Sequence, residues 1–208
     1  VIIHGTVSKI GNGAFRGCSA LSQVTLSEGT TTIGTAAFLG CSRLRSITLP
    51  EGLTTIQGGA FCNCDLANLS FPKSLTTIDD VYYESWGYGS HEYGVFTNNK
   101  SLSNIVIPEN VTKMGSFAFS GCSSLKNIVL NDNLLSIGQN AFENTNINKI
   151  ILDPSSPVTL EVFPNAFANC FESISIELAN KDSSLILYDN AFCNVENVNI
   201  YVANIANR

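Results

Sequence analysis

The segment Ile33 to Thr55, IGTAAFLGCSRLRSITLPEGLTT, recurs with variations along nearly the whole chain. The separation of Phe15, Phe38 and Phe61 gives a repeat unit of 23 residues. A unit of this size is too small to bury its own apolar side chains, so stability must come from stacking each unit on its neighbours. The Ala-Phe pair that marks the register returns at 14–15, 37–38, 60–61, 118–119, 141–142, 166–167 and 191–192.

Within a unit, the apolar residues hold fixed positions, and two halves can be distinguished. The stretch from Leu44 to Leu53 matches the strand segment of a leucine-rich repeat, L-x-x-L-x-L. In the other half, Ile-Gly-x-x-Ala-Phe-x-x-Cys replaces the usual helix. This combination resembles the BspA-type (Treponema pallidum-type) leucine-rich repeat family of bacterial surface proteins. The resemblance covers about residues 1 to 202, and seven Ala-Phe copies make it specific.

The period-2 alternation of the strand residues predicts that one strand face points inward in every unit. Successive strands should pair into one parallel sheet that lines a concave surface, and the resemblance implies a right-handed α/β solenoid. We expect Thr-Thr-Ile-Gly to form a short extended segment and Ala-Phe to sit in a short helical turn on the convex side, with the Phe side chains in the core. One solenoid of about eight rungs should therefore span residues 1–208, with the end of a ninth at Val1/Ile3. The strand pairs are Val24/Leu26, Ile47/Leu49, Leu69/Phe71, Ile105/Ile107, Ile128/Leu130, Ile150/Leu152, Ile176/Leu178 and Ile200/Val202.

Composition and charge narrow the classes of function. The chain is 44% hydrophobic and only 13% charged, and Asn, Ser and Thr replace charges on the surface, which suits an extracellular scaffold. The chain has a net charge of -6, and its sequence shows no basic stripe that could bind phosphates. We therefore expect no nucleic-acid partner. No stretch approaches the ~18 apolar residues of a membrane span. Because the sequence opens at Val1 in mid-repeat, we expect a piece of a longer secreted or surface protein, with any anchor outside it.

The seven cysteines are better explained as structural thiols than as disulfides. Five of them occupy the position three residues after the Phe, where other units carry Asn99, Thr145 or Val195. Stacked equivalents would be close enough for a bond, but their parallel Cβ vectors do not suit the disulfide dihedral. Cys62-Asn63-Cys64 has no His or second Cys pair nearby in sequence, so we expect neither a metal site nor a cofactor.

The sequence offers little for catalysis. It has only two histidines, His4 and His91, and none of the H-E-x-x-H, G-x-S-x-G or phosphate-loop motifs. Asp79-Asp80 is a carboxylate pair, but neighbours on an exposed loop point apart more often than they cooperate. We therefore expect a protein that is not an enzyme.

One insertion interrupts the repeat, and it is a candidate binding element. The segment 79–95, DDVYYESWGYGSHEYGV, contains 13 residues more than the matching part of the second unit. Aromatic side chains with polar tips, mixed with Gly and Ser, are typical of adaptable contact loops. The alternative is that the rings pack on the convex flank and bind no ligand. The candidate residues are Tyr82, Tyr83, Trp86, Tyr88, His91 and Tyr93.

A second candidate surface is the outward face of the strands. Val106, Val129 and Ile151 hold the same outward position in three consecutive rungs and should form a small apolar stripe beside a column of Asn residues. Solenoids commonly bind partners on this face. The alternative is that β-branched residues are there because they favour strands.

Together these patterns predict a binding scaffold without catalysis that recognises a protein or a glycan. The family resemblance implies adhesion to host or neighbouring-cell macromolecules. The alternative is a structural spacer that displays other domains of a longer surface protein.

Overall fold

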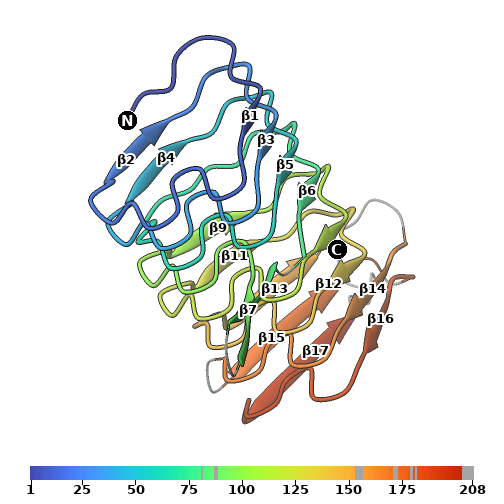
Figure 1. Ribbon diagram of the computed structural model, residues 1–208. Helices are drawn as coiled ribbons and strands as arrows, with labels where there is room; N and C mark the ends of the chain where they lie inside the picture. The colour runs from blue at the N-terminus through green and yellow to red at the C-terminus, as the bar shows by residue number, and fades with distance from the viewer. Residues whose placement is uncertain are drawn as a thin grey trace.

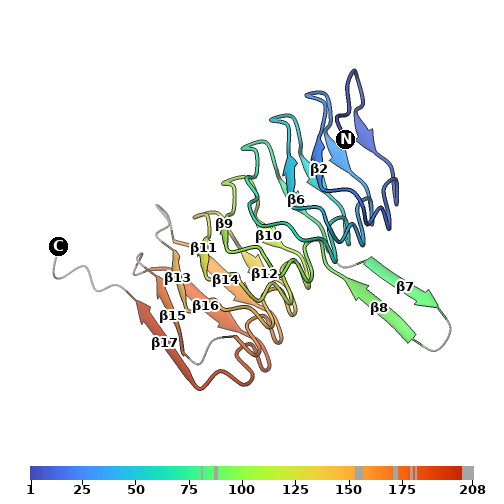
Figure 2. The same ribbon diagram turned by 90° about the vertical axis from the view of Figure 1, so that its left-hand side faces the viewer.

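Each repeat unit contributes two short segments of extended chain, and equivalent segments of successive units lie side by side in a parallel β-solenoid (Figure 1). The computed structural model describes residues 1–80, 82–86, 89–152, 157–170, 173–178, 180 and 182–202. The rungs follow one another from the first unit at one end of the molecule to β17 at the other (Figure 2). Every strand pairing within the solenoid is parallel, as the sequence predicts.

The Thr-Ile segments form one continuous sheet, which we call the threonine-strand sheet. From β1 to β14 the last residue of each strand is an Ile, Met or Val that points inward and is buried, and the residue before it lies on the opposite face. In β16, at the end of the sheet, Ile186 is 42% exposed and Leu187 is 43% exposed. In sheet order its strands are β1 (Lys9–Ile10), β3 (Thr32–Ile33), β5 (Thr55–Ile56), β6 (Thr77–Ile78), β10 (Lys113–Met114), β12 (Ser136–Ile137), β14 (Thr159–Val162) and β16 (Ser184–Leu187).

The L-x-x-L-x-L segments form a second face, the leucine-strand face, which was predicted to be one sheet. Among the described residues this prediction is wrong in one respect, because the face is divided into three parallel sheets. These are β2 (Gln23–Thr25) with β4 (Ser46–Thr48), β9 (Asn104–Val106) with β11 (Asn127–Val129), and β13 (Lys149–Leu152) with β15 (Ser173–Leu178) and β17 (Asn197–Val202). The first residues pair beside β2 through a parallel bridge from Ile2 to Thr25, as expected for the end of a further rung.

Two of the three breaks in this ladder follow a shortened turn, and the third separates the displaced residues 68–70 from β9. Leu44 follows Cys41 by three positions, but Leu66 follows Cys64 by only two, and Ile147 likewise follows Thr145 by two. The ladder is interrupted just before the strand that follows each short turn, namely between β4 and residues 68–70 and between β11 and β13. Because the chain enters the strand one residue early, its hydrogen-bonding groups are displaced relative to the preceding rung.

The Ala-Phe segments form tight turns, and the described residues contain no helix, so the predicted helical turns are wrong. Two left-handed residues flank each pair: in the second unit Ala36 has φ 52° and Gly40 has φ 74°. The backbone N–H groups alternate, since Ala37 donates to Gly34 O at 3.1 Å within its own turn and Phe38 donates to Ala60 O at 2.8 Å in the next rung. A helix would direct every N–H along its own axis, so the bonds between rungs, which alternate N–H groups of the turn make, would be lost.

The Phe side chains form a continuous stack through the core, which confirms the prediction for this position. Phe38 lies between Phe15 and Phe61, with ring centroids 5.1 and 5.2 Å apart and planes within 2° of parallel. The stack continues through Phe96, Phe119, Phe142, Phe167 and Phe192. The rings from Phe38 to Phe167 are fully buried, so this column is the main apolar support of the solenoid.

The side chain at the cysteine position, beside this column, donates a hydrogen bond to a backbone carbonyl. Cys41 Sγ donates to Phe15 O at 3.0 Å, and Cys122 Sγ donates to Phe96 O at 3.2 Å, in each case reaching the preceding rung. Asn99 Nδ2 makes the same bond to Phe61 O at 2.8 Å. The seven thiols are free, and burial raises the pKa of Cys122 to about 12. These contacts support the interpretation of the column as structural thiols.

Candidate functional site

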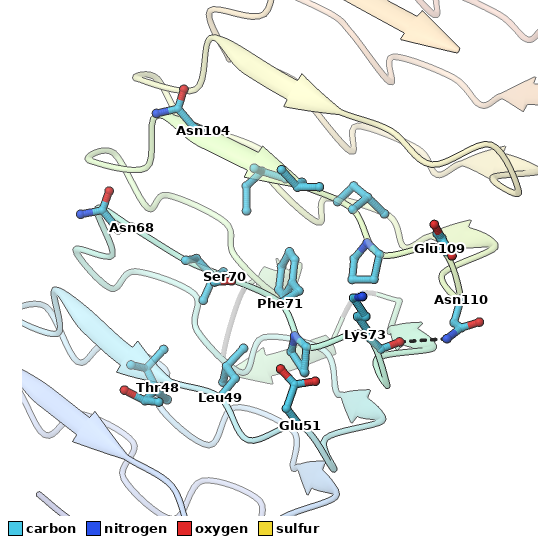
Figure 3. A pocket seen from close by; sticks show the side chains of 17 residues that line it. Thr48, Leu49, Glu51, Asn68, Ser70, Phe71, Lys73, Asn104, Glu109 and Asn110 are labelled. Carbon is cyan, nitrogen blue, oxygen red and sulfur yellow. Dashed lines mark hydrogen bonds between the residues drawn. The ribbon is translucent and has the colours of Figure 1, made fainter. Parts of the chain in front are cut away.

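A groove opens on the leucine-strand face where the ladder is broken. It encloses about 870 Å³ and is lined by three successive rungs, β4, residues 68–73 and β9 with the turn that follows it. Figure 3 shows Phe71 in its centre, with Thr48 and Leu49 on one side and Asn104 on the other. Leu49, Leu69 and Phe71 are only partly buried, so the groove floor is apolar.

The backbone around this groove is open to further hydrogen bonding. β4 has β2 as its ladder partner and β9 has β11, and no strand pairing joins either to residues 68–70. The facing edges of β4 and β9 therefore carry N–H and C=O groups without a ladder partner among the described residues. Such edges are able to accept an extended segment of another chain.

Two features hold the displaced rung in place. The larger ring of Phe71 replaces Leu49 of the preceding unit and packs against Phe96, with centroids 5.6 Å apart and planes at 60°. Asn99, which occupies the cysteine position of its unit, is buried and accepts the Leu66 N–H through Oδ1 at 3.0 Å. Because both contacts lie in the core, packing fixes the displaced position of this rung and keeps the groove open.

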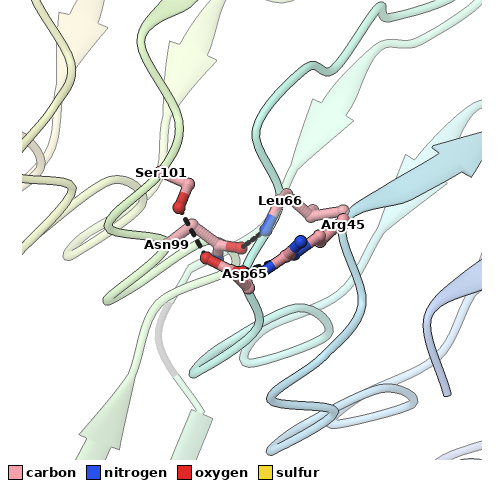
Figure 4. A network of polar contacts seen from close by, with 5 residues as sticks. All are labelled: Arg45, Asp65, Leu66, Asn99 and Ser101. Carbon is pink, nitrogen blue, oxygen red and sulfur yellow. Dashed lines mark hydrogen bonds and ion pairs between the residues drawn. The ribbon is translucent and has the colours of Figure 1, made fainter. Parts of the chain in front are cut away.

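A polar network lies at the shortened turn beneath the rung (Figure 4). Arg45 Nε donates to Asp65 Oδ2 at 3.0 Å, and the Ser101 hydroxyl donates to Asp65 Oδ1. These contacts, first the Ser101 hydrogen bond and then Arg45, hold the pKa of Asp65 below its usual value. The network joins three successive rungs and orients the turn that enters the groove.

The predicted apolar stripe lies beside this groove. Val106 is 61% exposed, Val129 is 56% exposed and Ile151 is 49% exposed, and Val106 and Val129 are direct partners in the β9–β11 ladder. Val106 also lines the groove itself. The predicted Asn column is present, because Asn127 Nδ2 donates to Asn104 Oδ1 at 2.6 Å. Val106 thus connects the stripe with a groove that sequence reasoning did not identify.

Farther along the same face, charges follow the stripe. Lys149 Nζ lies 2.7 Å from Glu177 Oε1, and Tyr201 is exposed next to Glu177 in the ladder. The ion pair is solvent-exposed, so it contributes little to stability. At the stripe position the surface therefore changes from apolar in β9, β11 and β13 to charged at Glu177 in β15.

The insertion forms an antiparallel hairpin of β7 (Tyr82–Trp86) and β8 (Gly89–Tyr93), which projects from the stack of rungs (Figure 2). Tyr82 and Tyr93 are partners at its base, with ring centroids 6.2 Å apart. Both rings pack on a small buried cluster of Ala36, Leu39 and Cys62. For these two residues, the contacts are those of the packing alternative.

The other aromatic candidates of the insertion lie farther along the hairpin. Tyr83, Trp86 and His91 have backbone positions in β7 and β8, and Tyr88 lies outside the described residues. The base of the hairpin packs on the Ala-Phe turns, whereas the stripe residues lie in β9, β11 and β13 of the leucine-strand face. The two predicted sites are therefore separate elements, and their roles as binding surfaces stay predictions.

In the part of the chain that the structure describes, no group of three His, Cys, Asp or Glu side chains is placed to hold a metal ion. The same part contains no helix that is long and apolar enough to cross a membrane.

Stacked parallel strands, an inward Phe column and a Leu-rich strand in each unit define a leucine-rich repeat solenoid. Residues 1–86 and 91–207 match the sequence profile of the BspA type leucine rich repeat region, in six copies. The chain therefore belongs to the BspA-type leucine-rich repeat family, as its sequence indicates.

Solved structures agree with this assignment. A leucine-rich repeat protein from T. pallidum is 30% identical with a TM-score of 0.67, covering 79% of this chain and 71% of that one. One from Bacteroides ovatus is 21% identical with a TM-score of 0.61, covering 99% of this chain and 62% of that one. A leucine rich cell surface protein from Faecalibacterium prausnitzii is 19% identical with a TM-score of 0.58, covering 96% and 69% respectively. A comparison of the sequence with curated proteins finds no match.

Proposed function

We propose that this chain is a non-catalytic binding scaffold of a secreted or surface-attached bacterial protein, and that it recognises a protein or a glycan. In this proposal residues 1–208 act as one solenoid. The observation that carries the proposal is the exposed apolar stripe of Val106, Val129 and Ile151, which leads into the groove between β4 and β9. Solvent-exposed β-branched residues beside a groove with an apolar floor are typical of a contact surface.

At this groove the chemistry favours a protein ligand. An extended peptide would add backbone hydrogen bonds to the open edges of β4 or β9 while its apolar side chains covered Phe71 and Val106. Strand addition supplies affinity from the backbone and specificity from the pockets for alternate side chains. A glycan would leave the apolar floor poorly matched, because sugar hydroxyls need polar partners.

The extracellular location is supported by family membership and by the similarity to the Faecalibacterium prausnitzii protein, which is a cell surface protein. An adhesin-like role is part of this proposal and rests on the family resemblance alone. The alternative function is a spacer that displays other domains, in which case the stripe and the groove have no ligand.

The test is a screen of the purified chain on arrays of host-matrix proteins, bacterial surface proteins and glycans, followed by two substitutions. Val106→Lys and Val129→Lys should each weaken binding to a protein hit at least tenfold, because a charge replaces an apolar contact. Gln23→Lys is the matched control, since it adds the same charge on an exposed position of the same face in β2. Unchanged binding in both valine variants would refute the assignment of the surface, and absence of any hit would favour the spacer.

A further inference from the structure

The residue that follows each inward residue of the threonine-strand sheet changes character along the solenoid. In this position, four early or central rungs have glycine and the last two have aromatic residues. In chain order, the residues at this position are Gly11, Gly34, Gln57, Asp79, Gly115, Gly138, Phe163 and Tyr188. A Cβ on Gly138 would lie 2.7 Å from the Gly115 carbonyl carbon, so this position stays without a side chain for steric reasons.

A cleft lies over two of these glycines, Gly115 and Gly138. It encloses about 500 Å³ between Asp79 and Asp80 on one side and Phe163 on the other, with Gly115 and Gly138 between them. β6, β10, β12 and β14 are successive strands of the sheet, so Asp79 and Phe163 are three rungs apart. At roughly 4.8 Å per rung this separation is about 14 Å, which leaves room for one or two sugar rings between the side chains.

Phe163 forms a fixed aromatic wall of the cleft. Its ring stacks on Tyr188 with centroids 4.8 Å apart and planes at 15°, and the Tyr188 hydroxyl donates to Glu161 Oε1 at 3.1 Å. Because β14 lies between β12 and β16, the face that contacts Tyr188 is the one toward β16. The opposite ring face is directed to the side of Gly138, which has no side chain, and Phe163 lines the cleft.

The facing wall is polar and oriented by the backbone. Asp79 Oδ1 accepts the Asp80 N–H at 2.9 Å, and Asp80 Oδ1 accepts the Ser116 N–H at 2.9 Å. The exposed Gln139 side chain lines the cleft between the two walls and supplies both a donor and an acceptor. Lys113 also lines the cleft and offsets part of the negative charge of the two carboxylates.

We propose that this cleft binds a pyranose ring of a neutral glycan. The C–H face of the sugar carries partial positive charge and would stack on the open, electron-rich face of Phe163. Sugar hydroxyls would donate to Asp79 and exchange hydrogen bonds with Gln139. A quaternary ammonium group would also be attracted by an aromatic face and carboxylates, but Lys113, Gln139 and the hydroxyl side chains of the cleft favour a neutral polyhydroxylated ligand. The site is independent of the leucine-strand face.

The test is saturation-transfer NMR with the methyl glycosides of glucose, galactose, mannose and N-acetylglucosamine at millimolar concentration, and with tetramethylammonium as the cationic probe. The wild-type chain should transfer saturation to one face of at least one sugar ring. Phe163→Leu, which keeps an apolar contact with Tyr188 but removes the aromatic face, should weaken that sugar at least tenfold. Asp79→Asn, which keeps the acceptor for the Asp80 N–H, should weaken it as well.

The controls separate this proposal from the one on the leucine-strand face. Val129→Lys should leave the sugar signal unchanged, and Phe163→Leu should leave binding of a protein hit unchanged. Absence of transfer to every sugar, equal binding by Phe163→Leu, or binding of tetramethylammonium without any sugar would each overturn the proposal. Circular dichroism and the melting temperature establish that both variants are folded.

Discussion

At the scale of single residues, each unit depends on a few positions that face the next rung. Phe38 stacks on Phe15 and Phe61, and Cys41 donates to the Phe15 carbonyl. Left-handed residues such as Ala36 and Gly40 turn alternate N–H groups toward the neighbouring rung. The same residues therefore define both the turn and the stacking.

Replacing Phe38 by Ala should lower the free energy of unfolding by about 3 to 5 kcal/mol, because a fully buried ring leaves a cavity in the stack. Phe15→Ala is the internal comparison and should cost less, since Phe15 is only partly buried. Urea denaturation followed by circular dichroism measures both. A loss below about 1 kcal/mol for Phe38→Ala would show that the stack does not carry the core.

The buried thiols should make stability depend on alkaline pH. Burial raises the pKa of Cys62 and of Cys122 from 9.0 to about 12, so the unfolded chain loses these protons first. Stability is full below pH 9 and falls as the pH rises from 9 to 12, by on the order of 1 kcal/mol per pH unit for each thiol.

The measurement is urea denaturation across this pH range for the wild type and for Cys122→Thr. Threonine is accepted at this position, since Thr145 occupies it in another unit and donates to the Phe142 carbonyl of that same unit at 2.8 Å, and it removes the titrating group. The variant should show a shallower alkaline slope. Identical slopes would contradict the role of Cys122 in the pH dependence.

At the scale of elements, the hairpin and the displaced rung are the two departures from the repeat. The hairpin is fastened through Tyr82 and Tyr93 on the cluster of Ala36, Leu39 and Cys62. The adjoining Gly59 has φ 68°, and a Cβ there would lie 3.1 Å from Tyr93 Cβ, so glycine allows the close approach. The base of the hairpin thus belongs to the packing of the solenoid.

Tyr93→Ala should lower the free energy of unfolding by about 1 to 2 kcal/mol, as expected when a partly buried ring is removed from an apolar cluster. The pair Trp86→Ala and Tyr88→Ala should instead leave the melting temperature nearly unchanged. If the hairpin is a second contact surface, the pair should also abolish binding of the ligand concerned, since exposed aromatic anchors contribute to association. A clear loss of stability in the pair would assign these rings to packing and remove them as candidate contacts.

The repeat, the parallel strands and the Phe core could be predicted because they depend on residues that recur in every unit. The helical turns were wrongly predicted, since Ala-Phe was taken as a helical signal and the residues on both sides of it, mostly Gly or Asn but also Ala36 and Phe117, were not taken as left-handed positions. The groove was missed although its cause is visible in the sequence, as one residue fewer between Cys64 and Leu66. Register displacement depends on contacts between rungs, such as Phe71 with Phe96, which periodicity alone does not contain.

At the scale of the whole molecule, the solenoid presents two different faces to possible ligands. The threonine-strand sheet is continuous and carries the cleft beside Phe163, whereas the leucine-strand face is interrupted and carries the groove beside Val106. The groove and the cleft are lined by different residues on different strands. The two proposed sites can therefore be tested separately in one chain.

The most direct test of the proposed function is hydrogen–deuterium exchange of the chain with and without its array hit. A ligand on the leucine-strand face should slow exchange at 46–51, 68–73, 104–110 and 127–129, because its backbone would bond to the open edges of β4 and β9. Exchange in the hairpin and in the threonine strands β1, β3 and β5 should remain unchanged. Protection confined to the hairpin, or absent from the groove while the ligand is bound, would contradict the assignment of this face as the binding surface.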